Sequence, residues 1–133
     1  MTPGDEPRWV PPVAIRAIHH QQILEHGGLQ GVRHATTLEA ALARPRQRWG
    51  HGELHTIPEL AAAFAEAIVV AHPLADGNMP SGCLVAVVCW GLNGFSFEAF
   101  NESVVLNIRR LAAGELPWAE LATWFGAQSS PPT

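Results

Sequence analysis

Apolar positions repeat with a helical period along most of the chain. In residues 13–26, Ile15, Ile18 and Ile23 are spaced to share one face of a helix. The pair Gly27-Gly28 follows, and glycine is the usual residue just past a helix end. The pattern therefore predicts a first helix over residues 13–26, preceded by a proline-rich extended arm at residues 1–12.

A second helix is expected from Thr36 or Thr37, because Thr36 and Glu39 have the spacing of a capping box. It should end near Ala43, since Pro45 follows. Residues 46–56 contain two glycines among polar residues, which indicates a loop or a short hairpin.

Two strongly apolar segments follow. Pro58 begins the first as a first-turn proline, and Leu60, Phe64 and Ile68 form its stripe. Residues 81–92 are apolar on every side, as in the central helix of a bundle. A buried strand is the alternative, but the chain shows no partner strands of matching length.

Residues 97–113 and 117–125 predict two further helices. The fold class is therefore all-α: a compact bundle of about six helices with a short flap loop. We expect a helical domain at residues 13–127 and a loose tail at residues 128–133.

Composition restricts the function. The chain has 133 residues, enough for one domain, and 47% of them are hydrophobic, which excludes a disordered tail. The net charge of −4 argues against a broad nucleic-acid surface. All eight basic residues are arginines. A phosphate would therefore have to be held by arginine, histidine, backbone N–H groups or a metal.

Two features favour a cytoplasmic protein. The only cysteines, Cys83 and Cys89, point to different faces of a helix, and two free thiols fit a reducing compartment. The N-terminus has neither a basic start nor an apolar signal core, and the longest apolar stretch is too short to span a bilayer.

The chemistry is concentrated in residues 72–82, between two predicted helices. A Gly77-Asn78 turn leading into a helix makes an anion cradle, because free N–H groups and the helix dipole point the same way. Asp76 can hold Mg²⁺, and His72 can act as a general base toward a hydroxyl. These groups suit phosphoryl or nucleotidyl transfer. By spacing alone, a simple turn between helices is the commoner explanation.

This segment resembles the Fic/Doc signature His-x-Phe-x-Asp-Gly-Asn-Lys-Arg-Thr. The resemblance is closest to the Doc (death-on-curing) branch and covers roughly residues 15–95 at family-like spacing. The supporting blocks are Ile18-His19, Ile23, Gly27-Gly28, Gly31-Val32-Arg33, residues 38–45, residues 60–64 and Leu92-Asn93-Gly94.

The resemblance assigns roles residue by residue. His72 matches the catalytic histidine, Asp76 the metal-associated acid, and Gly77 and Asn78 the anion-binding pair. Ser81 takes the place of the nucleotide-binding threonine.

Besides this conservative change at Ser81, the segment departs from the signature at three positions. Leu74 replaces phenylalanine, which keeps an apolar anchor. Met79 and Pro80 stand where Doc proteins have lysine and arginine, so two phosphate-binding cations are missing.

The resemblance implies a Doc-like toxin that transfers phosphate, or AMP, from ATP with Mg²⁺ to a protein hydroxyl, with weakened activity. Doc toxins act on elongation factor Tu and are held in check by an antitoxin, Phd in the founding pair. The alternative is a pseudoenzyme that keeps the fold and binds an antitoxin or a target.

The segment around Trp49 is the position where a flap guides the target in relatives. Arg46 and Arg48 share a face if this segment is extended, and they are candidates for the missing positive charge. A solvated basic loop is the alternative explanation.

Overall fold

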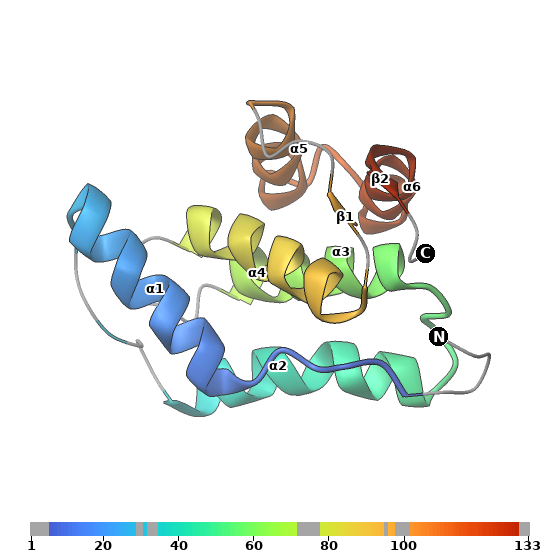
Figure 1. The fold of residues 1–133 in the computed structure, drawn as a ribbon, viewed down its shortest axis with the longest axis horizontal. Coiled ribbons are helices and arrows are strands. Elements are labelled where there is room, and N and C mark those ends of the chain that lie inside the picture. The colour runs from blue at the N-terminus through green and yellow to red at the C-terminus, as the bar shows by residue number, and fades with distance from the viewer. Residues whose placement is uncertain are drawn as a thin grey trace.

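The computed structural model describes residues 6–28, 31, 35–71, 78–94, 96–97 and 102–130. These residues form six helices: α1 (Pro12–His26), α2 (Ala35–Gly50), α3 (Ile57–Ala71), α4 (Asn78–Leu92), α5 (Glu102–Ala112) and α6 (Trp118–Gln128). Two short strands, β1 (Ser96–Phe97) and β2 (Ser129–Ser130), pair antiparallel, with Ser96 opposite Ser130. The prediction of an all-helical fold is confirmed (Figure 1).

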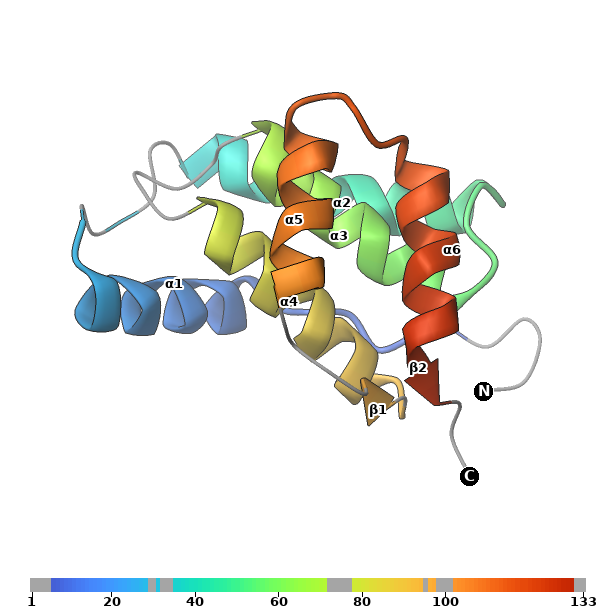
Figure 2. The ribbon, with the colours of Figure 1, turned by 90° about the horizontal axis from the view of Figure 1, so that it is seen from above.

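The helices are arranged around a central pair. α3 and α4 run side by side, with α1 and α2 on one side and α5 and α6 on the other (Figures 1 and 2). Among the described residues, no helix is both long and apolar enough to cross a membrane.

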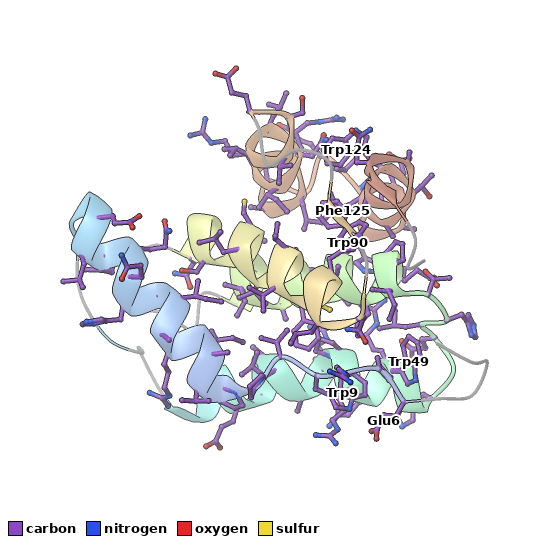
Figure 3. All side chains as sticks on the ribbon, in the orientation of Figure 1. Glu6, Trp9, Trp49, Trp90, Trp124 and Phe125 are labelled. Atoms are coloured by element: carbon purple, nitrogen blue, oxygen red, sulfur yellow. The ribbon has the colours of Figure 1, made fainter. Side chains whose placement is uncertain are left out.

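α3 is the most enclosed helix, because α2, α4, α5 and α6 all pack against it. Every residue from 60 to 69 is buried except Glu66, which is half-buried. The sequence had predicted α4 as the buried centre and a one-sided stripe for α3. α4 is buried along most of its length, with Trp90 meeting Phe125 of α6 edge-on at 4.9 Å (Figure 3). The centre is therefore shared by α3 and α4.

A capping box fixes the start of α3. Thr56 Oγ1 accepts a hydrogen bond from the Glu59 N–H at 3.3 Å, and Glu59 Oε1 accepts one from the Thr56 N–H at 3.0 Å. Pro58 lies in the first turn, as predicted. The same Thr-x-x-Glu pattern occurs twice in the sequence, at Thr36 and at Thr56, and the capping box described here is the one at Thr56.

The predicted end of α2 was wrong. The helix continues through Pro45 to Gly50, although an interior proline costs ~3 kcal/mol. Leu38, Leu42 and Pro45 are buried at helical spacing, and α2 packs against α3, so burial of this face offsets the cost of the proline. Arg46, Arg48 and Trp49 consequently lie on a helix, and the expected flap is reduced to residues 51–56.

The N-terminal arm packs onto the ends of two helices. Its Pro7 and Val10 are buried. Trp9 meets Trp49 of α2 edge-on at 6.4 Å (Figure 3). Asn93, just after α4, accepts a hydrogen bond from the Arg8 N–H at 2.8 Å and donates one to the Arg8 carbonyl at 3.0 Å. The arm thus joins the C-terminal ends of α2 and α4.

Replacing Asn93 by alanine should lower the free energy of unfolding by about 1–2 kcal/mol, because the side chain also donates to the Cys89 carbonyl at 2.8 Å. Urea denaturation measures the change. Asn107→Ala is the matched control, since no hydrogen bond joins that half-buried side chain to the described residues. Equal losses for the two variants would show that the arm contacts add nothing.

Candidate active site

The predicted catalytic segment joins two helices of the central pair. α3 ends at Ala71 and α4 begins at Asn78, so residues 72–77 connect these two ends. His72, Leu74, Asp76 and Gly77 lie outside the described residues. The described members of the predicted site are Asn78 and Ser81 on α4, together with Arg46, Arg48 and Trp49 on α2.

The start of α4 has the properties of an anion-binding helix end. Asn78 is its first residue and is half-buried, and the first turn contains no acidic residue. The first N–H groups of a helix have no carbonyl partner within it and carry partial positive charge. Pro80 is the third residue of this turn and has no N–H, so this cradle has one donor fewer than usual.

Ser81 lies deeper in the protein than expected for a side chain that binds a nucleotide. Its side chain is fully buried, and its Oγ has no hydrogen-bond partner among the residues that the structure describes. The hydroxyl therefore lies within the helical core, one turn from the start of α4. In this arrangement Asn78 is the better placed of the two to meet a nucleotide.

Removing the Ser81 hydroxyl should not harm the fold. A buried polar group without a partner costs about 1–3 kcal/mol, so Ser81→Ala should leave stability unchanged or raise it by about 1 kcal/mol. Thermal unfolding followed by circular dichroism tests this. A clear loss of stability would mean that the hydroxyl does have a partner in solution.

The two cysteines of α4 are not nucleophiles at neutral pH. Burial raises the pKa of Cys83 to about 12, against a smaller opposing effect of a backbone hydrogen bond. Burial alone raises the pKa of Cys89 to about 12. Both groups stay as neutral thiols that fill the core.

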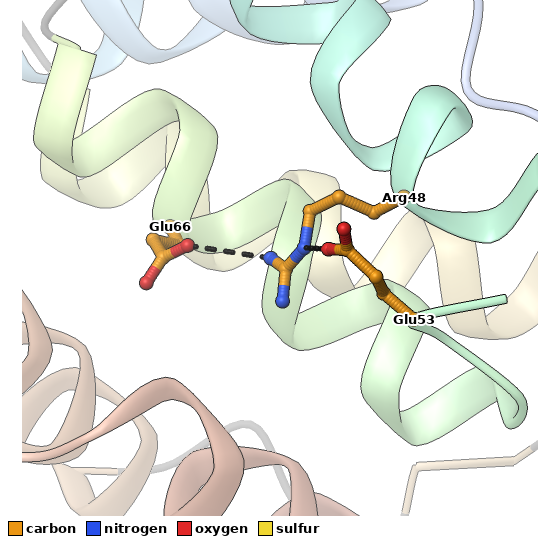
Figure 4. Close-up of polar contacts among 3 residues, drawn as sticks. All are labelled: Arg48, Glu53 and Glu66. Atoms are coloured by element: carbon orange, nitrogen blue, oxygen red, sulfur yellow. Dashed lines mark hydrogen bonds and ion pairs between the residues drawn. The ribbon is translucent and has the colours of Figure 1, made fainter. Parts of the chain in front are cut away.

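Arg48 is held by two carboxylates. Its Nε lies 3.2 Å from Glu53 and its Nη1 lies 3.5 Å from Glu66, and the guanidinium stacks on Trp118 at 4.4 Å from the ring centroid (Figure 4). These residues line a polar surface pocket of about 450 Å³, together with Arg44, Gln47 and His51. Arg46 lies 5.2 Å from the Trp9 ring and 3.6 Å from a Glu6 oxygen.

The structure does not bring these arginines to the start of α4. They lie near the C-terminal end of α2, whereas α4 begins at the opposite end of the domain (Figures 1 and 2). The sequence analysis missed Glu66 and Trp118 as partners of Arg48. Glu66 gave a usable signal, since it is the only charged residue between positions 60 and 71.

The start of α4 could hold the anionic part of a nucleotide, and among the described residues no group of three or more metal-binding side chains is found. The α4 N-terminus and Asn78 can receive phosphate oxygens. The carboxylate expected to hold Mg²⁺, Asp76, lies outside the described residues.

Comparison with known proteins adds an independent result. A sequence model of the Fic/DOC family matches residues 9–89. A comparison with curated proteins found no match. The matched span contains α1, α2, α3, the connecting residues 72–77 and most of α4, and it is more than half of the chain. The chain therefore belongs to the Fic/DOC family.

Proposed function

We propose that this protein is a Doc-like enzyme that transfers phosphate, or AMP, from ATP to a hydroxyl of a protein target. Members of the Fic/DOC family are typically transferases that use ATP, generally with Mg²⁺. The observation that carries the proposal is the position of Asn78. It follows Gly77 directly and begins a 15-residue helix, so the signature residues lead into a helix N-terminus.

The roles follow from the chemistry of each side chain. His72 accepts the proton of the attacking hydroxyl. The hydroxyl oxygen then forms a bond to phosphorus, and the bond to the leaving ADP breaks; in AMP transfer the leaving group is pyrophosphate. Gly77 and Asn78 orient the phosphate oxygens at the start of α4. Asp76 would hold Mg²⁺, which offsets the negative charge of the phosphates when it is bound.

We expect this activity to be weak. Met79 and Pro80 are the second and third residues of α4, where the Doc signature has two cations. Arg46 and Arg48 were candidates to replace the two missing cations. Both lie close to carboxylates at the other end of the domain. These observations also favour the second candidate, a catalytically inactive member that binds an antitoxin or a target.

The partners of this proposal come from the Doc branch. A Phd-like antitoxin would control the protein in the cytoplasm, and elongation factor Tu is the first target to test. Growth arrest after expression without an antitoxin would support the toxin role.

Labelled ATP distinguishes the alternatives. The protein is incubated with Mg²⁺ and elongation factor Tu, with the label placed in either the γ-phosphate or the α-phosphate. If elongation factor Tu becomes labelled only by ATP that carries the label in the γ-phosphate, the protein transfers phosphate. If it becomes labelled by ATP that carries the label in the α-phosphate, the protein transfers AMP. Chelation of Mg²⁺ should abolish both. Absence of transfer, with ATP binding intact, would favour the inactive binding module.

A further inference from the structure

α3 and α4 approach each other closely at Gly82. A Cβ atom built on Gly82 would lie 2.7 Å from Val69 Cγ1, 3.4 Å from the Ala65 carbonyl oxygen and 3.7 Å from Ile68 Cβ. Both Gly82 and Val69 are buried. A side chain at position 82 must therefore displace the Val69 side chain or the α3 backbone that carries it, because a close-packed interior has no free volume to receive it.

This contact lies close to the residues that join the two helices. Gly82 is four residues after the start of α4, and Val69 is two residues before the end of α3. One helical turn is 3.6 residues, so the contact is about one turn from the start of α4 and about half a turn from the end of α3. The separation of α3 and α4 at this level sets the distance between the two anchor points of residues 72–77.

We propose that Gly82 is a positioning residue for the transfer reaction, an inference that rests on the proposed function. His72 follows the last residue of α3 in the sequence, whereas Gly77 directly precedes Asn78, the first residue of α4. The Gly82–Val69 contact therefore fixes the spacing of the two helix ends to which the base and the anion cradle are attached. A wider contact would change the position of the base relative to the anion cradle, although both would still be present.

The expected signature is a loss of rate with little loss of nucleotide affinity. A misplacement of ~1 Å can lower a rate by about 10²-fold, so Gly82→Ala should reduce kcat by about 10-fold to 10²-fold. The KM for ATP should change little, because Gly77 and Asn78 are adjacent at the start of α4 and should move together with that helix. Removing the obstructing methyl groups with Val69→Ala should restore most of the rate in the double variant Val69→Ala/Gly82→Ala.

Two controls separate positioning from stability. Gly91→Ala makes the same substitution on the same helix, but its Cβ would meet nothing within 4 Å. Ile108→Val removes one methylene from the fully buried Ile108 of α5, which does not flank residues 72–77. All variants are compared at a temperature at which circular dichroism shows them to be folded. Neither control should lower kcat.

Hydrogen exchange at the backbone amides of residues 72–78 supplies a readout independent of activity. Gly82→Ala should speed exchange there, the double variant should reverse the change, and neither control should alter it. Unchanged exchange in folded Gly82→Ala would overturn the proposal, as would faster exchange that Val69→Ala does not reverse. If the parent protein shows no transfer, the proposed function fails and Gly82 has no role in a reaction; the exchange result then decides only whether Gly82 sets the spacing of the ends of α3 and α4.

Discussion

Replacing His72 by alanine is expected to lower the transfer rate by about 10²-fold to 10⁴-fold, the range lost with a general base. The imidazole is the group that the resemblance assigns as general base, since the Asp76 carboxylate is assigned to Mg²⁺. Without it, the attacking hydroxyl must lose its proton to water. The measurement is kcat with saturating ATP and Mg²⁺, using the labelled assay.

His55→Ala is the matched control for this prediction. His55 is exposed in the turn between α2 and α3, away from the start of α4. Its removal should leave kcat unchanged, and ATP binding should survive in both variants. If His72→Ala transfers label as fast as the parent, another group is the base and the role carried over from the family fails.

Local sequence patterns correctly predicted the helices that can be identified from their own residues alone. The proline in the first turn of α3 and the apolar run of α4 both identify helices that the structure contains. The signature segment was found because its residues are consecutive. A helix start after Gly77 needs no information from distant parts of the chain.

Tertiary packing decided what local patterns could not. Pro45 is unfavourable inside an isolated helix, and its burial against the rest of the domain is visible only after α2 meets α3. From the sequence, Arg48 was a candidate for the missing positive charge, on the assumption that its segment is extended. Its ion pair with Glu66 joins residues on two helices, and no spacing rule connects them.

The largest gain in function should come from restoring the two cations. The variant Met79→Lys/Pro80→Arg should bind ATP or transfer phosphate about 10²-fold to 10⁴-fold better than the parent, since a charged contact to phosphate contributes ~1.5–3 kcal/mol. Both positions lie in the first turn of α4, which contains no acidic residue to neutralise them. Arginine at position 80 would also restore a backbone N–H and provide a bidentate phosphate contact.

The control for charge is Met79→Gln/Pro80→Gln, which restores the N–H without adding a cation. Calorimetry with ATP and Mg²⁺ should rank the Lys/Arg variant above this control, and this control at or above the parent. Equal affinities for the two variants would assign the defect to the missing N–H alone.

A rival arrangement makes the opposite prediction. If Arg46 or Arg48 supplies the missing charge, the parent already binds ATP, and Arg46→Ala/Arg48→Ala abolishes binding. The positions of both guanidinium groups beside Glu6, Glu53 and Glu66 argue against this, because each would have to leave a carboxylate and reach the other end of the domain. We therefore expect the alanine pair to lower stability while leaving ATP affinity unchanged. If the parent, the Lys/Arg variant and the alanine pair all fail to bind ATP with Mg²⁺, the protein is a binding module on a Fic/DOC scaffold.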